Sequence, residues 1–138
     1  MKKSLILIGF WLPPLALMGL IFYLSSRPAF AVSPNDWLNF IVFKSLHFLE
    51  YAFLFILLYR AFKNTINGPS PFLWSVLAAF FWAVTDEIHQ LYVPTRQGHP
   101  RDIAIDFLGI LFGLVCLWII LPKAPKRLQL WAKKLALI

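Results

Sequence analysis

Four long apolar segments follow one another along the chain, separated by short polar or proline-containing breaks. A helix of roughly 20 apolar residues crosses a bilayer core of about 30 Å. The breaks contain Ser-Ser-Arg-Pro at 25–28, Asn-Gly-Pro-Ser-Pro at 67–71, the segment 94–100 and the prolines at 122 and 125. The pattern predicts an all-α membrane protein, a four-helix transmembrane bundle with helices at about 4–24, 38–62, 72–93 and 102–121.

The end of the chain, residues 123–138, combines basic and apolar side chains. On a helix that begins after Pro125 the two kinds fall on opposite sides, which is typical of a helix lying in the membrane interface. We therefore expect residues 1–122 to form the transmembrane domain and residues 123–138 a basic amphipathic tail, with a partner-docking helix as the alternative. The apolar side holds Leu128, Trp131, Ala132 and Leu135, and the basic side holds Lys126, Arg127, Lys133 and Lys134.

Composition requires a membrane as the solvent. Hydrophobic residues make up 60% of the 138 residues and charged residues only 14%. A soluble domain of this size leaves a large share of its surface facing water, so it could not bury that much apolar surface. The single cysteine, Cys116, lies in an apolar segment, which excludes an internal disulfide and a cysteine metal cluster.

The first apolar segment also has some features of a secretory signal. Residues 1–3 are basic, and residues 29–31 fit a small-x-small cleavage site. However, the apolar segment is longer than the roughly 7–15 residues of a signal core, and Arg27 precedes the cleavage site. We therefore expect a retained transmembrane helix.

Lysine and arginine residues concentrate on one side of the predicted membrane. Positive charges in short flanks stay in the cytoplasm, so both termini are predicted to be cytoplasmic. The net charge of +7 then indicates attraction to the anionic inner leaflet and no binding of nucleic acid. The predicted inner side holds Lys2, Lys3, Arg60, Lys63, Lys123, Lys126, Arg127, Lys133 and Lys134, and the outer ends and loops hold Arg27, Arg96 and Arg101.

All acidic residues lie in the predicted outer half, several of them inside the apolar segments. An ionisable group at membrane depth is costly and indicates a functional site. At 100° per residue, the polar groups of each helix fall on one face, within arcs of about 60–120°. These faces hold Lys44, His47, Glu50 and Tyr51 on the second helix, Asp86, Glu87 and Gln90 on the third, and Asp102 and Asp106 on the fourth; Asp36 is the remaining acid.

The three polar faces predict a shared pocket that opens to the outer leaflet. Arginine binds phosphate through two hydrogen bonds, so Arg96 and Arg101, with Gln97 and His99, are expected to form a rim for an anionic headgroup. Candidate ligand-binding residues are Lys44, Tyr51, Gln90, Arg96, Arg101, Asp102 and Asp106, and candidate catalytic residues are His47, Glu50, Asp86 and Glu87.

Small residues give the helices a way to approach each other. Gly109 and Gly113 form a Gly-x-x-x-Gly stripe on the same face of the fourth helix as its two aspartates. Such stripes allow two helix backbones to come close, so we assign both glycines to helix packing. Ala79 and Ala83 offer the same opportunity on the third helix.

Two other interpretations of the polar residues remain open. The first is a sealed ion-pair network, with Lys44 paired to Glu50 or Asp86 and with Arg96 or Arg101 paired to Asp102. The second is a divalent metal site, although no diagnostic ligand motif is present. Its candidate ligands are His47, Glu50, Asp86, Glu87 and Asp106, whereas His89 is expected to be a solvated or packing residue.

Spaced motifs cover the chain up to about residue 120. They are Lys44-x-x-His47-x-x-Glu50-Tyr51, Asp86-Glu87-x-x-Gln90, Pro94-x-Arg96 and Asp102-x-x-x-Asp106-x-x-Gly109-x-x-x-Gly113, with Tyr23-Leu24-Ser25-Ser26 ending the first helix. In combination they resemble the VanZ-like family of small polytopic membrane proteins. One departure is Phe43, where the family often has an aspartate.

The resemblance implies a protein of the bacterial cytoplasmic membrane, whose namesake is associated with resistance to the lipoglycopeptide teicoplanin. We therefore expect the outward-facing pocket to bind or modify an anionic lipid-linked ligand, such as a cell-wall precursor or the lipid tail of a glycopeptide. An intramembrane hydrolase or transferase acting on a lipid phosphate, with or without a metal, is one alternative. A small transporter subunit is another.

Overall fold

The computed structural model describes residues 2–28, 31–66, 70–96 and 98–138, and these residues form helices without any strand. Four helices are long and apolar enough to cross a membrane, which confirms the predicted all-α fold. They are α1 (Lys2–Ser25), α2 (Asp36–Thr65), α3 (Pro71–Gln90) and α4 (Pro100–Val115), the last continued by a π-helical turn, Cys116–Ile120, and by α5 (Leu121–Lys123). The tail forms α6 (Lys126–Lys134).

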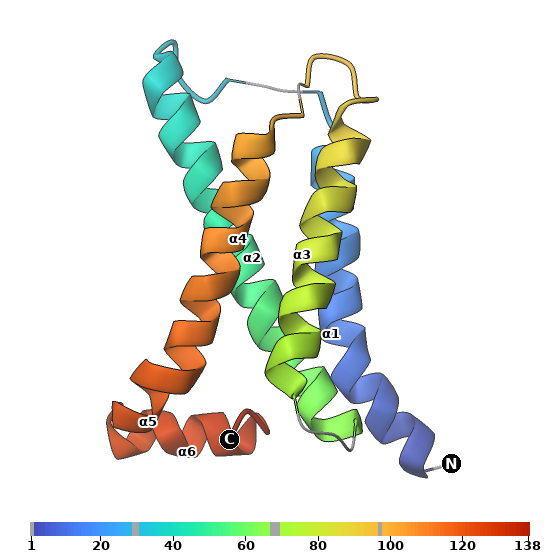
Figure 1. Ribbon diagram of the computed structural model, residues 1–138, viewed down its shortest axis with the longest axis vertical. Helices are drawn as coiled ribbons and strands as arrows, with labels where there is room; N and C mark the ends of the chain where they lie inside the picture. The colour runs from blue at the N-terminus through green and yellow to red at the C-terminus, as the bar shows by residue number, and fades with distance from the viewer. Residues whose placement is uncertain (1, 29–30, 67–69, 97) are drawn as a thin grey trace.

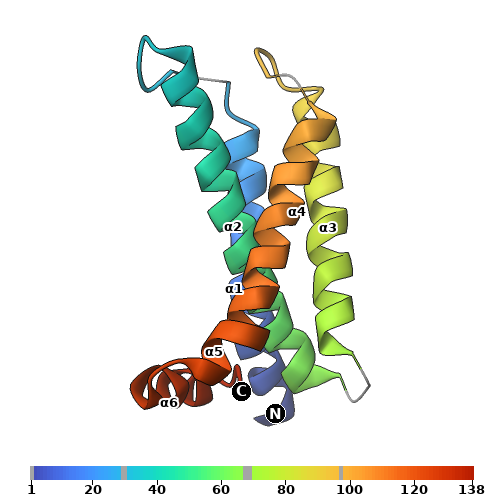
Figure 2. The same cartoon turned by 60° about the vertical axis from the view of Figure 1, so that its left-hand side comes forward.

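The four long helices run side by side, and α6 lies across one end of them (Figures 1 and 2). We call the end that holds the α1–α2 and α3–α4 connections the upper end. The lower end holds both termini, the α2–α3 connection and α6. In both views the upper end of α2 leans away from the other helices.

Capping residues and prolines determine where the helices begin. The Asn35 side chain accepts hydrogen bonds from the first backbone N–H groups of α2, and Ser70 does the same for α3. Proline occupies the first position of α3 and of α4, where a missing N–H costs nothing. The third helix ends at Gln90 rather than at 93, since a turn with Thr95 at φ 68° follows it.

The π-helical turn has its physical cause in Pro122. Proline has no N–H to donate to the carbonyl four residues earlier, so a regular α-helix cannot continue through it. The backbone N–H of Leu121 bonds instead to the Cys116 carbonyl, five residues earlier. After this turn the chain bends into α6, and the Gln129 side chain donates to the carbonyls of Pro122 and Ala124.

Helices α2 and α4 are in backbone contact at the two glycines of α4. A Cβ atom at Gly109 would overlap the carbonyl oxygen of Phe48, and one at Gly113 would lie 2.7 Å from the carbonyl oxygen of Ala52. Glycine is thus required at both positions for this approach. The contact fixes the register of α4 along α2 and therefore determines which polar residues meet above it.

Helix α6 is held to the lower end of α2 by hydrogen bonds. Arg60 Nε donates to the Leu135 carbonyl at 2.6 Å, and Lys63 Nζ donates to the Leu137 carbonyl at 3.1 Å. These carbonyls follow the end of α6, where no intrahelical donor is available. Leu128 and Trp131 stay exposed on α6, which is the arrangement expected of a helix that places an apolar side into a bilayer interface.

Candidate functional site

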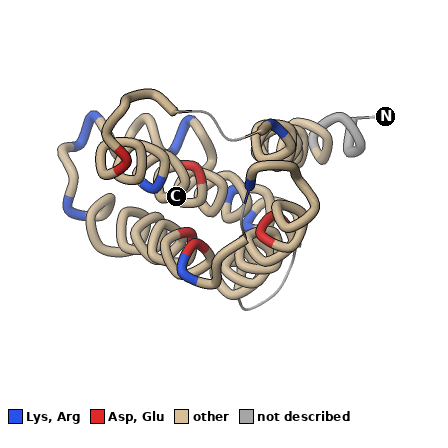
Figure 3. The backbone as a smooth tube through the Cα atoms, turned by 90° about the horizontal axis from the view of Figure 1, so that it is seen from above, with Lys and Arg blue, Asp and Glu red and all other residues tan. Residues whose placement is uncertain are grey.

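Buried polar residues gather in the upper half of the bundle, where they come from several helices. The view from above shows the acidic positions spread over several of the long helices (Figure 3), and by sequence these are α2, α3 and α4. A buried polar group must find hydrogen-bond partners or lose stability. The buried polar side chains of this region are Ser25, Asp86, Glu87, Gln90, Asp102 and Asp106.

Asp86 joins α3 to α1. Its side chain is 1% exposed, and one carboxylate oxygen accepts a hydrogen bond from Ser25 Oγ at 2.5 Å. The other oxygen accepts from Gln90 Nε2 at 2.9 Å, one turn further along α3. Both oxygens are therefore engaged within the protein, and Ser25 and Gln90 hold Asp86 in one orientation.

A second set of contacts ties the α3–α4 loop to the end of α1. The Arg96 guanidinium donates to the backbone carbonyls of Arg27 at 2.8 Å and of Leu24 at 3.0 Å. The Leu24 carbonyl, in the last turn of α1, also accepts from the backbone N–H of Arg27, and Arg96 adds a second donor to it and a donor to the carbonyl of Arg27 just beyond the helix. His89 lies 3.0 Å from Ser26 Oγ and its ring stacks against Phe22, with centroids 4.1 Å apart. His89 thus packs at the α1–α3 interface.

Lys44 and Asp102 form the closest ion pair of the site. Lys44 Nζ lies 2.5 Å from Asp102 Oδ2, and Arg101 Nε lies 3.6 Å from the other oxygen of Asp102. The sealed-network alternative paired Lys44 with Glu50 or Asp86, and the structure pairs it with Asp102 instead. Of the two arginines that this alternative offered to Asp102, Arg101 is the one that approaches it. The glycine contact below sets this outcome, because it places the first turn of α4 beside Lys44.

His47 and Asp106 face each other one turn below that pair. His47 Nδ1 lies 3.4 Å from Asp106 Oδ1, and Asp106 is almost completely buried. Neither atom has a hydrogen-bond partner among the described residues, and the same holds for the hydroxyl of Tyr51 and for Asp102 Oδ1. Four buried polar atoms on α2 and α4 therefore keep unused hydrogen-bonding capacity.

The candidate metal ligands do not assemble. Within the described residues no group of three histidine, cysteine, aspartate or glutamate side chains could hold a metal ion. Asp86 is occupied by Ser25 and Gln90, and Glu87 accepts a hydrogen bond from the backbone N–H of His99. Asp86 and Glu87, two of the candidate oxygen ligands, thus form hydrogen bonds within the protein. The described residues offer the metal alternative no support.

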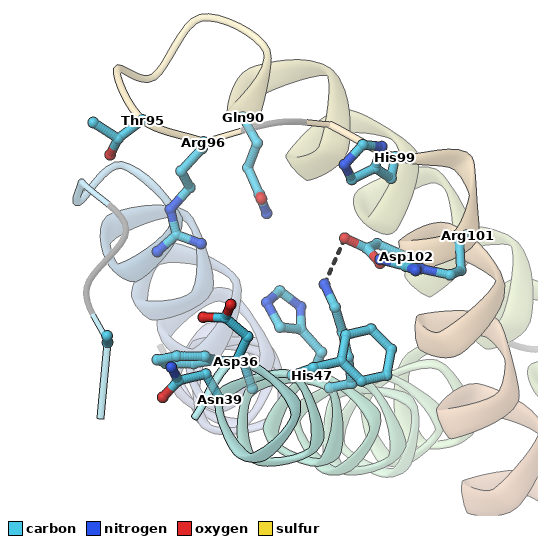
Figure 4. Close-up of a pocket in the computed structure, with 13 residues that line it drawn as sticks. Asp36, Asn39, His47, Gln90, Thr95, Arg96, His99, Arg101 and Asp102 are labelled. Carbon is cyan, nitrogen blue, oxygen red and sulfur yellow. Dashed lines mark hydrogen bonds and ion pairs between the residues drawn. The ribbon is translucent and has the colours of Figure 1, made fainter. Parts of the chain in front are cut away.

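A cavity of about 630 Å³ opens at the upper end (Figure 4). In this view the His47 ring and the Gln90 amide point into it, the Arg96 guanidinium lies at the side of α1, and the Lys44–Asp102 ion pair lies at the other side. We call it the first cavity. It is lined by Ala31, Asp36, Asn39, Phe40, Phe43, Lys44, His47, Gln90, Thr95, Arg96, His99, Arg101 and Asp102.

A second cavity of about 240 Å³ lies between α1 and α2. It shares Phe43, His47 and Arg96 with the first cavity, so these three residues separate the two spaces. The second cavity is lined by Ile21, Leu24, Ser25, Arg27, Phe43, Leu46, His47, Glu50 and Arg96.

The predicted site residues thus divide into three groups. Lys44, His47, Gln90, Arg96, Arg101 and Asp102 line the first cavity, and Glu50 lines the second together with His47 and Arg96. Tyr51, Asp86, Glu87 and Asp106 are buried and line neither cavity. Gln97 lies outside the described residues.

Sequence reasoning missed part of the wall of the first cavity. Asp36, Phe40 and Phe43 precede His47 on α2, and the spacings along the chain are four, three and four residues. They continue the polar face of this helix toward its start, so extending the helical periodicity by two turns would have found them. Ser25 was missed as a partner of Asp86, although it stands in the motif that ends α1.

Comparison with known proteins gives one result. Residues 10–121 match the family described as VanZ/LLP1. Neither the curated proteins nor the solved structures returned a match. The matched segment begins in α1 and ends at the start of α5, so it includes most of α1, all of α2, α3 and α4, and every lining residue of both cavities. The chain therefore belongs to the VanZ/LLP1 family.

Proposed function

We propose that this protein binds an anionic lipid-linked ligand, with the headgroup in the first cavity and the cavity facing the exterior of a bacterial cytoplasmic membrane. The observation that carries the proposal is the position of Arg101 at the mouth of the first cavity. Its side chain is 61% exposed, and its contact with Asp102 is 3.6 Å long. The guanidinium is therefore available to a ligand, unlike the Arg96 guanidinium, which donates to two backbone carbonyls.

Arginine geometry supports an anionic headgroup. A guanidinium presents parallel N–H groups that match two phosphate or carboxylate oxygens. The Arg101 guanidinium also lies over the ring of Phe40, 4.8 Å from its centroid, which holds it at the cavity wall. Lys44 adds a second cation beside it, shared with Asp102.

Charge placement supports the outward orientation. Both termini lie at the lower end, which also carries most basic residues: Arg60, Lys63, Lys123, Lys126, Arg127, Lys133 and Lys134, with Lys2 and Lys3 at the start of α1. No acidic residue occurs in these segments. Under the positive-inside rule the lower end is cytoplasmic, and the first cavity then opens on the opposite side.

The family context supports ligands of the cell envelope. The resemblance described above links the family's namesake to teicoplanin, which itself carries a lipid tail. A lipid-linked cell-wall precursor and a lipoglycopeptide both combine an apolar chain with a polar or charged group. Either would place its polar part in a cavity rimmed by Arg101 and its apolar part in the bilayer.

The test measures binding of farnesyl phosphate to the purified full chain in lipid nanodiscs, with farnesol as the uncharged comparison. We expect Arg101→Ala to weaken farnesyl phosphate binding about tenfold or more, because hydrogen bonds to charged groups contribute about 1.5–3 kcal/mol. Farnesol binding should not change. Arg127→Ala removes the same charge from exposed α6 and should leave both affinities unchanged. Equal binding by Arg101→Ala and the unmodified protein would refute the proposal.

A second candidate function has its own observation. His47 lines both cavities and lies 3.4 Å from the buried carboxylate of Asp106, an arrangement in which a carboxylate orients a histidine that accepts a proton. This supports an intramembrane hydrolase or transferase that acts on a lipid phosphate. Release of inorganic phosphate or diphosphate from farnesyl diphosphate, lost in His47→Gln but retained in His89→Gln, would support it. Binding without any turnover would exclude it for this substrate.

A further inference from the structure

The second cavity differs from the first in its position and in its walls. It lies between α1 and α2, and four of its lining residues are apolar, Ile21, Leu24, Phe43 and Leu46. Leu46 lies about 15 Å below the first residue of α2, and Ile21 about 6 Å below the last residue of α1. In the proposed orientation the second cavity therefore extends from the end of α1, where Ser25 and Arg27 line it, into the hydrocarbon core at Ile21 and Leu46.

The rim of the second cavity is open to the surroundings of the bundle. Leu24 is 44% exposed and Leu46 is 48% exposed, although both line the cavity. Side chains that line a cavity and are also exposed mark its edge. Because these edges belong to two membrane-spanning helices, the second cavity opens sideways toward lipid.

The polar residues of the second cavity do not favour an anion. Ser25 is already bonded to Asp86, Arg96 to the carbonyls of Leu24 and Arg27, and the Arg27 guanidinium to the hydroxyl and ring of Tyr23. Glu50 adds an acid to the wall, which repels an anionic headgroup if it is ionised. An amphipathic ligand is thus oriented, with its charge in the first cavity beside Arg101 and its uncharged part in the second.

Phe43, His47 and Arg96 line both spaces, so the two cavities adjoin at these residues. We infer that the second cavity is a lateral slot through which the hydrocarbon chain of the ligand passes between α1 and α2 into the bilayer. This inference rests on the proposed function. It specifies a ligand that resides in the membrane and reaches the first cavity without leaving the hydrocarbon core.

A bulky side chain at the edge of the slot tests the inference. Leu46→Trp places an indole at the edge, whereas Phe53→Trp places one on the same face of α2, seven residues further on, at a residue that is 55% exposed and lines neither cavity. We expect Leu46→Trp to weaken binding of farnesyl phosphate in nanodiscs about tenfold or more, since overpacking an occupied site carries a penalty of that order. Phe53→Trp should bind as the unmodified protein does.

Inorganic phosphate serves as a second probe, because it reaches the first cavity from water. Inorganic phosphate should displace farnesyl phosphate from the first cavity equally well in Leu46→Trp and in the unmodified protein. If Leu46→Trp does not fold, Leu24→Trp on the opposite edge carries the same expectation, with the exposed Leu20→Trp as its control. Dodecyl phosphate, tested in parallel, distinguishes a straight acyl chain from a branched isoprenoid one, and a preference for either supports the slot.

The outcomes separate the inference from the proposed function. Unchanged farnesyl phosphate binding in Leu46→Trp, or an equal loss of farnesyl phosphate and inorganic phosphate, overturns the lateral slot. Binding that depends on Arg101 but not on Leu46 keeps the proposed function and refutes only the slot. Binding that is independent of Arg101 refutes the proposed function itself.

Discussion

The contact between α2 and α4 at Gly109 gives the sharpest prediction about stability. Replacing Gly109 with alanine adds one methyl group, and its carbon atom would overlap the carbonyl oxygen of Phe48. A carbonyl of the helix backbone cannot rotate away as a side chain can, so the two helices must separate. On an isolated helix the same change is favourable by about 1 kcal/mol, because alanine is the better helix former. Whether Gly109→Ala stabilises or destabilises the protein therefore depends on the contact between Gly109 and the Phe48 carbonyl.

The expected magnitude follows from the crowding. Overpacking costs about 1–3 kcal/mol, occasionally more, so after the gain of about 1 kcal/mol in helix propensity Gly109→Ala should still lower the free energy of unfolding by about 2 kcal/mol. Gly113→Ala should cost less, because its Cβ would lie 2.7 Å from the Ala52 carbonyl oxygen. Gly19→Ala in α1 meets nothing within 4 Å and should not destabilise the protein.

The assay is reversible unfolding of the purified protein in mixed micelles with increasing SDS, followed by tryptophan fluorescence. The three variants should rank from least to most stable as Gly109→Ala, Gly113→Ala and Gly19→Ala. Separation of the helices would also weaken farnesyl phosphate binding, since Lys44 and Asp102 meet directly above the contact. A Gly109→Ala protein as stable as Gly19→Ala would refute the close backbone approach of α2 and α4.

Three further predictions concern α1, α6 and the membrane orientation. Ser25→Ala removes the hydroxyl donor of a buried carboxylate on α3 and should cost about 1–3 kcal/mol in the same unfolding assay; Ser75→Ala, which loses only a bond within its own helix, should cost less. Arg60→Gln releases the carbonyl that ends α6, so trypsin should cleave the tail faster than in the unmodified protein; an unchanged rate would contradict the docking of α6. A cysteine at Val32 in intact bacteria should react with a membrane-impermeant maleimide, and one at Lys126 should react only after permeabilisation, both without the native cysteine; the reverse pattern would invert the topology.

The fold was largely predictable because hydrophobic length alone decides what can cross a bilayer. The four apolar segments correspond to the four long helices, and the amphipathic tail corresponds to α6. The end of α3 could not be located as well, because residues 91–93 are apolar but form a turn. The π-helical turn was signalled only by Pro122, which marks a break in α-helical bonding without specifying its form.

The direction of the polar faces was predictable, but their pairings were not. Helical periodicity placed polar residues of α2 and α4 on faces that meet, whereas Asp86 of α3 meets Ser25 of α1. The partner of Lys44, however, depends on how far α4 is shifted along α2, and the close approach at Gly109 and Gly113 sets this shift. Arg96 donates to the carbonyls of Leu24 and Arg27 because of the path that the α3–α4 loop takes. Helical periodicity does not describe the path of a loop.

The length and lean of α2 have a mechanical consequence. With 30 residues, this helix is about 45 Å long, which exceeds the bilayer core of about 30 Å. A helix longer than the membrane adapts by tilting, and a thinner bilayer demands a larger tilt. Because α2 is fixed to α4 near its middle, at Phe48 and Ala52, and to the segment after α6 at Arg60 and Lys63, a change in its tilt moves mainly its upper part, which forms one wall of the ligand site. The width of that site is therefore coupled to the thickness of the surrounding membrane.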